Sequence, residues 1–155
     1  MYLAYGSNLN LDQMDVRCPG AELIGYTTVS NMRLIFRGSG SGYYLSIERT
    51  PAGMIRSVPC GVFRISDADE KSLDVYEGYP RFYKKKLIKD LPLYMMDGSL
   101  RSGKLTAMAY VLPRSAPLGF PSNRYIQTCV QGYNDFGFDS EILRTAIEDT
   151  LNDMF

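Results

Sequence analysis

The chain has 155 residues, 45% of them apolar and 22% charged, so it has the size of one globular domain and can bury a core without disulfide or metal staples. Lysine plus arginine equals aspartate plus glutamate, 17 against 17, which gives no overall attraction to nucleic acid or to an anionic membrane. The absence of histidine excludes a Ser-His-Asp triad, a Cys-His pair and any metal site with histidine ligands.

The cysteines Cys18, Cys60 and Cys129 are widely spaced and lie in no paired motif. This argues against a disulfide framework and a zinc site, so we expect a reduced, cytoplasmic setting. No apolar run approaches the roughly 18 residues typical of a membrane span, and no signal-peptide pattern opens the sequence. Acid–base chemistry must then fall to a carboxylate, lysine, tyrosine or cysteine, of which carboxylates are the commonest.

The sequence opens with a short β-type run, Met1 to Ala4, followed by Tyr5-Gly6-Ser7-Asn8. A helical pattern begins at once in Leu9 to Arg17 and stops at Pro19-Gly20. A strand, a tight turn and a helix start in this order point several backbone N–H groups and the positive end of a helix dipole at one place. We therefore predict an anion site here and favour a carboxylate, because no phosphate-binding machinery follows.

The next part of the chain is rich in β-forming residues. Predicted strands are Glu22 to Ser30, Met32 to Arg37, Tyr43 to Glu48 and Val58 to Ile65. Gly38 to Gly42, between two of them, is typical of a mobile hairpin or lid. It is not expected to be a phosphate loop, because it lacks the lysine and hydroxyl ending and precedes a strand instead of a helix.

A helix is predicted to begin at Ser66, because Ser66 and Asp69 have the spacing of a capping box and acidic residues crowd the first turn. Leu73 and Tyr76 belong to its predicted buried stripe, and the glycine and proline that follow end it.

Phe82 to Leu93 and Leu105 to Leu112 are predicted to pair as strands across an Asp-Gly turn. Pro113 to Ser122 contains three prolines and is predicted to be an ordered surface loop. Two helices are expected at the end of the sequence, one from Asn123 and a more strongly amphipathic one that Asp139 caps.

Strands outnumber helices in the first two thirds, and no long alternation of strands and helices appears. The predicted fold class is therefore α+β, with a small mixed β-barrel, closed or nearly closed, and helices packed around it. No repeat or linker divides the sequence, so residues 1–155 are expected to form a single domain.

Glu77 is the candidate general acid and base. It lies at the C-terminal end of its helix, where the carbonyl end of the dipole opposes a negative charge. Partial burial against Tyr76 or Tyr79 would raise the pKa of the carboxyl further, toward the range of a base that must also act as an acid. From position alone, the alternative is a solvated glutamate in the last turn of a helix.

Four groups of residues follow one another along the chain: Tyr5-Gly6-Ser7-Asn8-Leu9, Leu73-Asp74 with Tyr76-Glu77-Gly78, Tyr79-Pro80 with Tyr83, and Pro121-Ser122 with Tyr125 and Gly132. In this order they resemble the gamma-glutamylcyclotransferase family, and the similarity extends to about Gly132. Lys84 and Lys85 depart from the family pattern, in which an arginine is common at this place, and lysine cannot supply the same planar fork.

The resemblance implies an enzyme that cyclises a γ-glutamyl amine or peptide to 5-oxoproline and releases a free amine or amino acid, with no cofactor and no metal. Glu77 would be the catalytic acid and base. The implied substrate-binding residues are Tyr5, Gly6, Ser7, Asn8, Tyr83 and Tyr125. For Tyr5 the alternative is a purely structural role, and for Tyr83 and Tyr125 it is to form the wall of the pocket. Ser7 is expected to be a turn residue and not a nucleophile, because no activating base is in view.

Other interpretations stay open at this point. The same loop would also suit a non-catalytic small-carboxylate-binding protein. A barrel that binds single-stranded nucleic acid through Tyr43, Tyr44 and the lysines at 84–86 is a third possibility, disfavoured by the zero net charge. The expected partner is a small γ-glutamyl molecule, with no nucleic acid and no membrane, and the expected state is a monomer or homodimer. Gly38 to Gly42 and Pro113 to Phe120 are expected to border the pocket and select the amine half.

Overall fold

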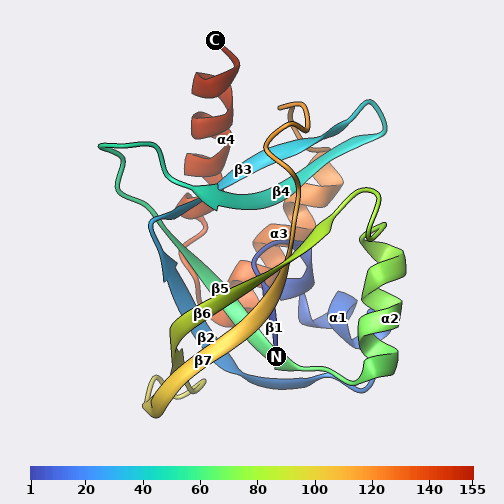
Figure 1. Cartoon of the computed structure of the whole chain (residues 1–155), viewed down its shortest axis with the longest axis vertical. Helices are drawn as coiled ribbons and strands as arrows, with labels where there is room; N and C mark the ends of the chain where they lie inside the picture. Colours follow the sequence, from blue (N-terminus) through green and yellow to red (C-terminus); the bar gives the residue numbers. More distant parts are fainter.

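The computed structural model describes residues 1–155, and its centre is a closed barrel with strand order β1-β5-β2-β6-β7 (Figure 1). The strands are β1 (Tyr2–Ala4), β2 (Glu22–Ser30), β3 (Met32–Ser39), β4 (Gly42–Arg49), β5 (Ser57–Arg64), β6 (Lys84–Tyr94) and β7 (Leu100–Val111). The helical elements are the 3-10 turn η1 (Ser7–Leu9) and the helices α1 (Leu11–Arg17), α2 (Asp67–Tyr76), α3 (Asn123–Phe136) and α4 (Glu141–Met154).

The short strand β1 closes the barrel, because it pairs antiparallel with β5 on one side and parallel with β7 on the other. All residues of β1 are buried, and so are those of β5 between its two ends. Both faces of these strands are covered, which is why their sequences are apolar without alternation. The predicted fold class, a small mixed barrel with helices around it, is confirmed.

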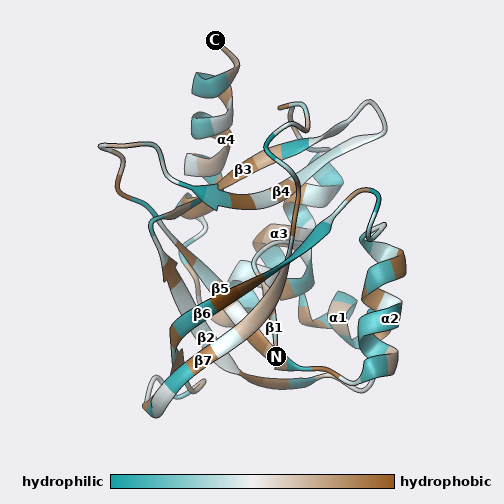
Figure 2. Ribbon diagram, in the orientation of Figure 1, coloured by the Kyte–Doolittle hydropathy of each residue, from teal (hydrophilic) through white to brown (hydrophobic).

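The β3–β4 hairpin is a separate two-stranded sheet that lies across one end of the barrel, with α4 next to it (Figure 1). Hydrophobic stretches run along the two strands and the barrel, whereas the outer turns of α4 carry hydrophilic residues (Figure 2). The register joins Ser39 directly to Gly42, so the predicted glycine-rich segment is a tight turn between two long strands. The predicted hairpin is therefore confirmed, while its mobility stays a prediction.

The proline-rich segment lies along β3. Leu118 forms an isolated bridge with Arg37, and the N–H of Gly38 donates to the Pro117 carbonyl oxygen (2.9 Å). The backbone polar groups of this irregular segment are satisfied by the hairpin, which agrees with the predicted ordered loop. Its predicted place beside the pocket is wrong, because no residue of 113–120 lines the cavity.

Of three predicted helix starts, the structure confirms one and shifts two. The capping box of α2 is present, with Ser66 and Asp69 bonded reciprocally. The first helix does not start at Leu9, because η1 intervenes and the Asn10 side chain caps α1 by accepting from Gln13 N (3.0 Å). Asp139 accepts from the N–H of the first residue of α4, which begins one residue later than an Asp139 N-cap would give. No helix of the chain is long and apolar enough to cross a membrane.

Candidate active site

The end of α2 fixes the position of Glu77, its C-capping residue. Gly78 follows with φ 63°, and its N–H donates to the Val75 oxygen (3.2 Å), while the Tyr79 N–H donates to the Asp74 oxygen (2.9 Å). These two bonds form a Schellman motif, in which glycine takes the left-handed conformation without the penalty of a Cβ atom. The glycine after the acid is thus explained by local geometry.

The turn after β1 brings Gly6, Ser7 and Asn8 to the wall of a cavity. The hydrogen bonds of η1 begin with the N–H of Leu9, which donates to Gly6 O (3.1 Å), so the N–H groups before it have no partner inside the turn. A Cβ atom on Gly6 would lie 3.1 Å from the Tyr125 hydroxyl, which is tighter than ordinary contact. Glycine therefore lets the loop approach α3 closely.

Asn8 joins this loop to the acid. Its Nδ2 donates to Tyr2 Oη (2.9 Å) and to Glu77 Oε1 (3.3 Å), and its Oδ1 accepts from Gln13 Nε2 (3.1 Å) and Arg17 Nη1 (2.9 Å). Both ends of the amide are occupied, which holds its orientation. The amide thereby positions the Glu77 carboxyl against the loop from which the anion site was predicted.

Burial raises the pKa of Glu77 from 4.5 to about 7, against the opposing effects of the Arg17 charge and the Asn8 hydrogen bond. At neutral pH both the acid and the base form are populated. The shift has the predicted direction, and burial, a cause that the sequence predicts, is the largest one. Tyr76 and Tyr79 are 54% and 38% exposed, and Tyr76 is not part of a buried stripe. Tyr76 instead stacks under the Arg17 guanidinium, whose central carbon lies 4.5 Å from the ring centroid.

Tyr5 and Tyr83 are buried and Tyr125 is partly buried, and burial raises the pKa of each hydroxyl. Tyr5 donates its proton to the Tyr110 carbonyl oxygen, and Tyr83 donates to Leu45 O (2.8 Å). Tyr125 instead accepts from Leu45 N (3.1 Å), which leaves its proton for another acceptor. Tyr5 and Tyr83 therefore have structural bonds in addition to their place in the cavity wall, and Tyr125 is the better candidate donor to a substrate oxygen.

The cavity has a volume of about 430 Å³. It brings together every residue that the sequence assigned to the site: Tyr5, Gly6, Ser7, Asn8, Glu77, Tyr83 and Tyr125. Ser41 of the hairpin turn also lines it, whereas no residue of 113–120 does. The proline-rich loop therefore does not border the cavity, because it is held along the hairpin strand β3.

Sequence reasoning missed several lining residues, among them Tyr2, Gln13, Arg17, Tyr44, Phe82 and Tyr110. For two of them a signal existed: Gln13 and Arg17 are four positions apart on α1 and therefore share one face. Tyr2 and Tyr110 depend on barrel closure, and Tyr44 and Phe82 on how the hairpin and the segment before β6 pack, which no local pattern reveals.

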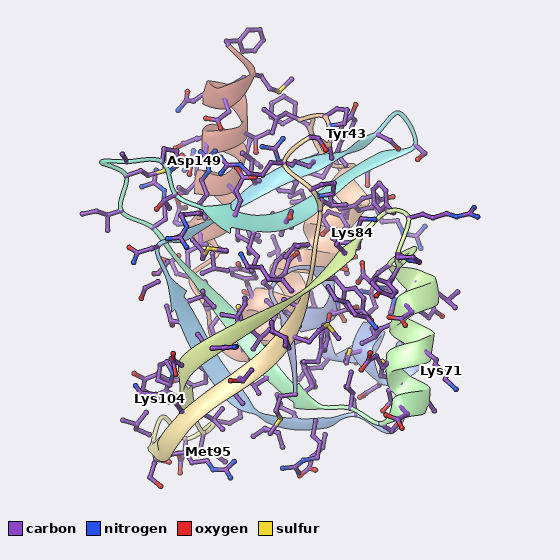
Figure 3. The ribbon with its side chains drawn as sticks, in the orientation of Figure 1. Tyr43, Lys71, Lys84, Met95, Lys104 and Asp149 are labelled. Carbon is purple, nitrogen blue, oxygen red and sulfur yellow. The ribbon has the colours of Figure 1, made fainter.

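Of the three lysines at the start of β6, Lys85 is paired with carboxylates. Lys85 Nζ pairs with Glu70 Oε2 (2.6 Å) and Asp74 Oδ1 (2.9 Å), and Tyr110 Oη also donates to Asp74 (2.6 Å). Lys85 thus ties β6 to α2, the helix that carries Glu77. Figure 3 shows Lys71 of the same helix pointing outward, away from the barrel. The pairing of Lys85 weakens the nucleic-acid interpretation, which used the lysines at 84–86. No group of three or more His, Cys, Asp or Glu residues is placed to hold a metal ion.

Comparison with known families agrees with this geometry. The profile described as "Gamma-glutamyl cyclotransferase, AIG2-like" matches residues 2–127. The chain belongs to this family. The resemblance found in the four sequence motifs is thus confirmed for most of the chain, and it supports an enzyme of the gamma-glutamyl cyclotransferase kind.

Solved structures show the same fold. An uncharacterized protein from Homo sapiens, loc79017, has a TM-score of 0.72 at 22% identity, with 94% of this chain and 84% of that chain covered. A structure named gamma-glutamyl cyclotransferase gives 0.72 at 21% identity, with the same coverage of 94% and 84%. A yeast gamma-glutamyl cyclotransferase specific to glutathione gives 0.55 at 9% identity and covers 98% of this chain and 95% of that chain. Comparison with curated protein sequences gives no match.

Proposed function

We propose that the protein cyclises a γ-glutamyl amine or peptide to 5-oxoproline and releases the free amine or amino acid, with Glu77 as general acid and base. One observation carries the proposal: an acid whose pKa is raised to about 7 lies hydrogen-bonded to the η1 loop in the wall of a single cavity. Family membership supports the reaction class.

The reaction is an intramolecular aminolysis. The substrate's α-amino nitrogen attacks the γ-carbonyl carbon, the new C–N bond closes a five-membered ring, and the bond from that carbon to the departing nitrogen breaks. The α-ammonium group first releases one proton to solvent and becomes the nucleophilic –NH2. Glu77 then takes one proton from the attacking nitrogen and returns it to the departing nitrogen, which leaves as –NH2, so the acid ends in its starting form. A pKa near 7 suits both transfers, because neither form of the carboxyl is scarce.

Substrate positioning falls to the loop and to Tyr125. The N–H groups of Gly6, Ser7 and Asn8 are proposed to bind the α-carboxylate, which places the amine near Glu77 and favours ring closure. The proton of Tyr125 is available for an oxygen of the γ-glutamyl group. Tyr5 and Tyr83 form the wall, and their oxygens can still accept from an ammonium group.

The test is a panel of γ-glutamyl amines, amino acids and short peptides, with 5-oxoproline measured by mass spectrometry. Release of 5-oxoproline together with an equal amount of amine supports the proposal. Thermal stabilisation by γ-glutamyl compounds without product would instead indicate the non-catalytic carboxylate-binding protein. If no member of the panel gives product or stabilises the protein, both the enzyme and the carboxylate-binding protein are contradicted. A cytoplasmic location and a monomeric or homodimeric state stay predictions.

A further inference from the structure

Arg17 is the one basic side chain that lines the cavity, and it has no acidic partner. Its Nη1 donates to Asn8 Oδ1 (2.9 Å), but the guanidinium forms no salt bridge and its Nε and Nη2 donate no hydrogen bond within the chain. Three other arginines that are at least partly buried, Arg33, Arg37 and Arg56, each pair with a carboxylate. An unpaired guanidinium in a cavity wall is suited to a carboxylate from a ligand, since the fork binds two oxygens at once.

The place of Arg17 relative to the acid decides which carboxylate it meets. Asn8 contacts Glu77 through Nδ2 and Arg17 through Oδ1, so the acid and the guanidinium lie on opposite ends of one amide. The guanidinium also stacks on Tyr76, which is more than half exposed, at the rim of the cavity. Arg17 therefore lies at the rim of the cavity, at the end of the Asn8 amide opposite to the acid.

The departing half of the substrate is expected to reach the same rim of the cavity. The γ-glutamyl group is held by the loop and the departing nitrogen lies beside Glu77, so whatever is attached to that nitrogen extends toward the rim. This step rests on the proposed function. We infer that Arg17 binds a carboxylate on the departing half of the substrate and thereby selects γ-glutamyl α-amino acids over γ-glutamyl amines that lack a carboxylate.

The rest of the rim agrees with this selectivity. Val75 is 81% exposed there and Tyr44 and Phe82 are partly exposed, so an apolar side chain of the departing amino acid has surface to pack on. Glu77 and Arg17 are the charged residues of the lining, so no carboxylate besides the catalytic one awaits a second ammonium group. A γ-glutamyl diamine would bring its free ammonium toward Arg17 and be rejected by like charge.

The test compares three substrates that share the γ-glutamyl group: γ-glutamyl-alanine, γ-glutamyl-alaninamide and γ-glutamyl-1,4-diaminobutane. The wild-type protein is expected to prefer the acid over the amide by about ten- to hundredfold in kcat/KM, and over the diamine by at least as much. Arg17→Gln should reduce the acid-to-amide ratio to near one, and Arg17→Lys should keep part of it. The control Arg81→Gln removes an exposed arginine that does not line the cavity and should leave the ratio unchanged.

The ratio is the useful quantity because Arg17 also contacts Asn8 and lowers the pKa of Glu77, effects that act on all three substrates alike. An Arg17→Gln variant that loses the same factor on acid and amide would overturn the inference and assign Arg17 to the γ-glutamyl half. Binding of the same compounds to Glu77→Gln by calorimetry separates the two proposals. Selective binding of γ-glutamyl-alanine, without turnover by the wild type, would support the role of Arg17 and contradict the proposed reaction. Turnover of γ-glutamyl-alanine and its amide at equal rates would support the reaction and contradict the role of Arg17. The absence of both binding and turnover would overturn the proposed reaction and the role of Arg17.

Discussion

Asn8 Nδ2 lies 3.3 Å from Glu77 Oε1, although 69 positions separate the two residues in the chain. The bond joins the turn after β1 to the end of α2. It is made possible by β1, which is wedged between β5 and β7 and so holds the start of the chain inside the barrel. The loop that we expect to bind a carboxylate and the acid that we expect to move protons are thus positioned by one side-chain amide.

Removal of that amide should reduce activity without unfolding the protein. Asn8→Ala removes the bonds to Glu77 and Arg17, so the acid loses its fixed orientation, and kcat should fall by about ten- to hundredfold. The pKa of Glu77 should also rise, because the Asn8 bond favours the ionised form. Steady-state kinetics over a pH series measure both effects. Wild-type kcat in a variant that unfolds normally would contradict the role of Asn8.

The wild-type pH–rate profile should report the titration of Glu77. The base form exists above a pKa of about 7, so kcat/KM should fall tenfold per pH unit below that value and level off above it, until another group titrates. Arg17→Gln should move this acid limb to higher pH, because the Arg17 charge lowers the pKa of Glu77. An acid limb near pH 4.5 in the wild type would mean that Glu77 titrates as an exposed glutamate does.

The same pKa predicts that Glu77 destabilises the fold at neutral pH. Its pKa is about 7 in the folded state and near 4.5 when unfolded, so between these values the unfolded chain is ionised first and the free energy of unfolding falls as pH rises. Glu77→Gln escapes this cost and should be more stable at pH 8, by on the order of 2 kcal/mol, since one pKa unit is worth about 1.4 kcal/mol and burial is incomplete. The difference should shrink to near zero as pH falls to about 4.5.

Thermal unfolding of the two proteins over that pH range measures this difference. Glu148→Gln, which removes an exposed glutamate without an ion pair, is the matched control and should unfold like the wild type at every pH. A Glu77→Gln variant that is less stable than the wild type at pH 8 would show that the carboxylate is stabilised, not strained, in the cavity.

Gly78 should matter for activity and not only for stability. Gly78 has φ 63° and its added Cβ would lie 3.1 Å from the Phe82 Cβ, whereas Gly137 has φ 70° with nothing within 4 Å. Both substitutions to alanine should cost about 1 kcal/mol of unfolding free energy, because both impose a left-handed conformation on a residue with a side chain. Gly78→Ala alone should also reduce kcat, by about tenfold, since it shifts the turn that carries Glu77. Equal kcat values for Gly78→Ala and Gly137→Ala would show that the turn after α2 does not affect catalysis.

Much of this arrangement followed from local patterns. The capping box at Ser66, the glycine after Glu77 and the Asp-Gly turn have short-range causes, and each is present where the sequence predicted it. The family motifs added the connection between the loop and Glu77, which neither segment contains by itself. The capping box and the two glycine turns are predictable because they depend only on residues that are neighbours in the sequence.

The remaining errors concern contacts between distant segments. Tyr76 has helical spacing from Leu73, which predicts a buried side chain, but it is more than half exposed and lies under Arg17. The proline-rich segment is predicted to lie at the cavity, but its Pro117 carbonyl oxygen accepts from the N–H of Gly38 at the hairpin edge. Arg17 itself has the sequence position of an ordinary last-turn cation, and only the packing of η1 against α1 shows that it lies beside Asn8. No local pattern encodes the position of one segment against another.

The central claim is that Glu77 transfers the protons of a cyclisation. The most direct measurement is 5-oxoproline release from a γ-glutamyl amino acid by the wild type, Glu77→Gln and the control Glu148→Gln under the same conditions. Because glutamine keeps the shape and the acceptor oxygen but cannot take up a proton, we predict a loss of kcat of at least about a hundredfold for Glu77→Gln and none for the control. Equal rates of 5-oxoproline release by the wild type and Glu77→Gln would contradict this mechanism.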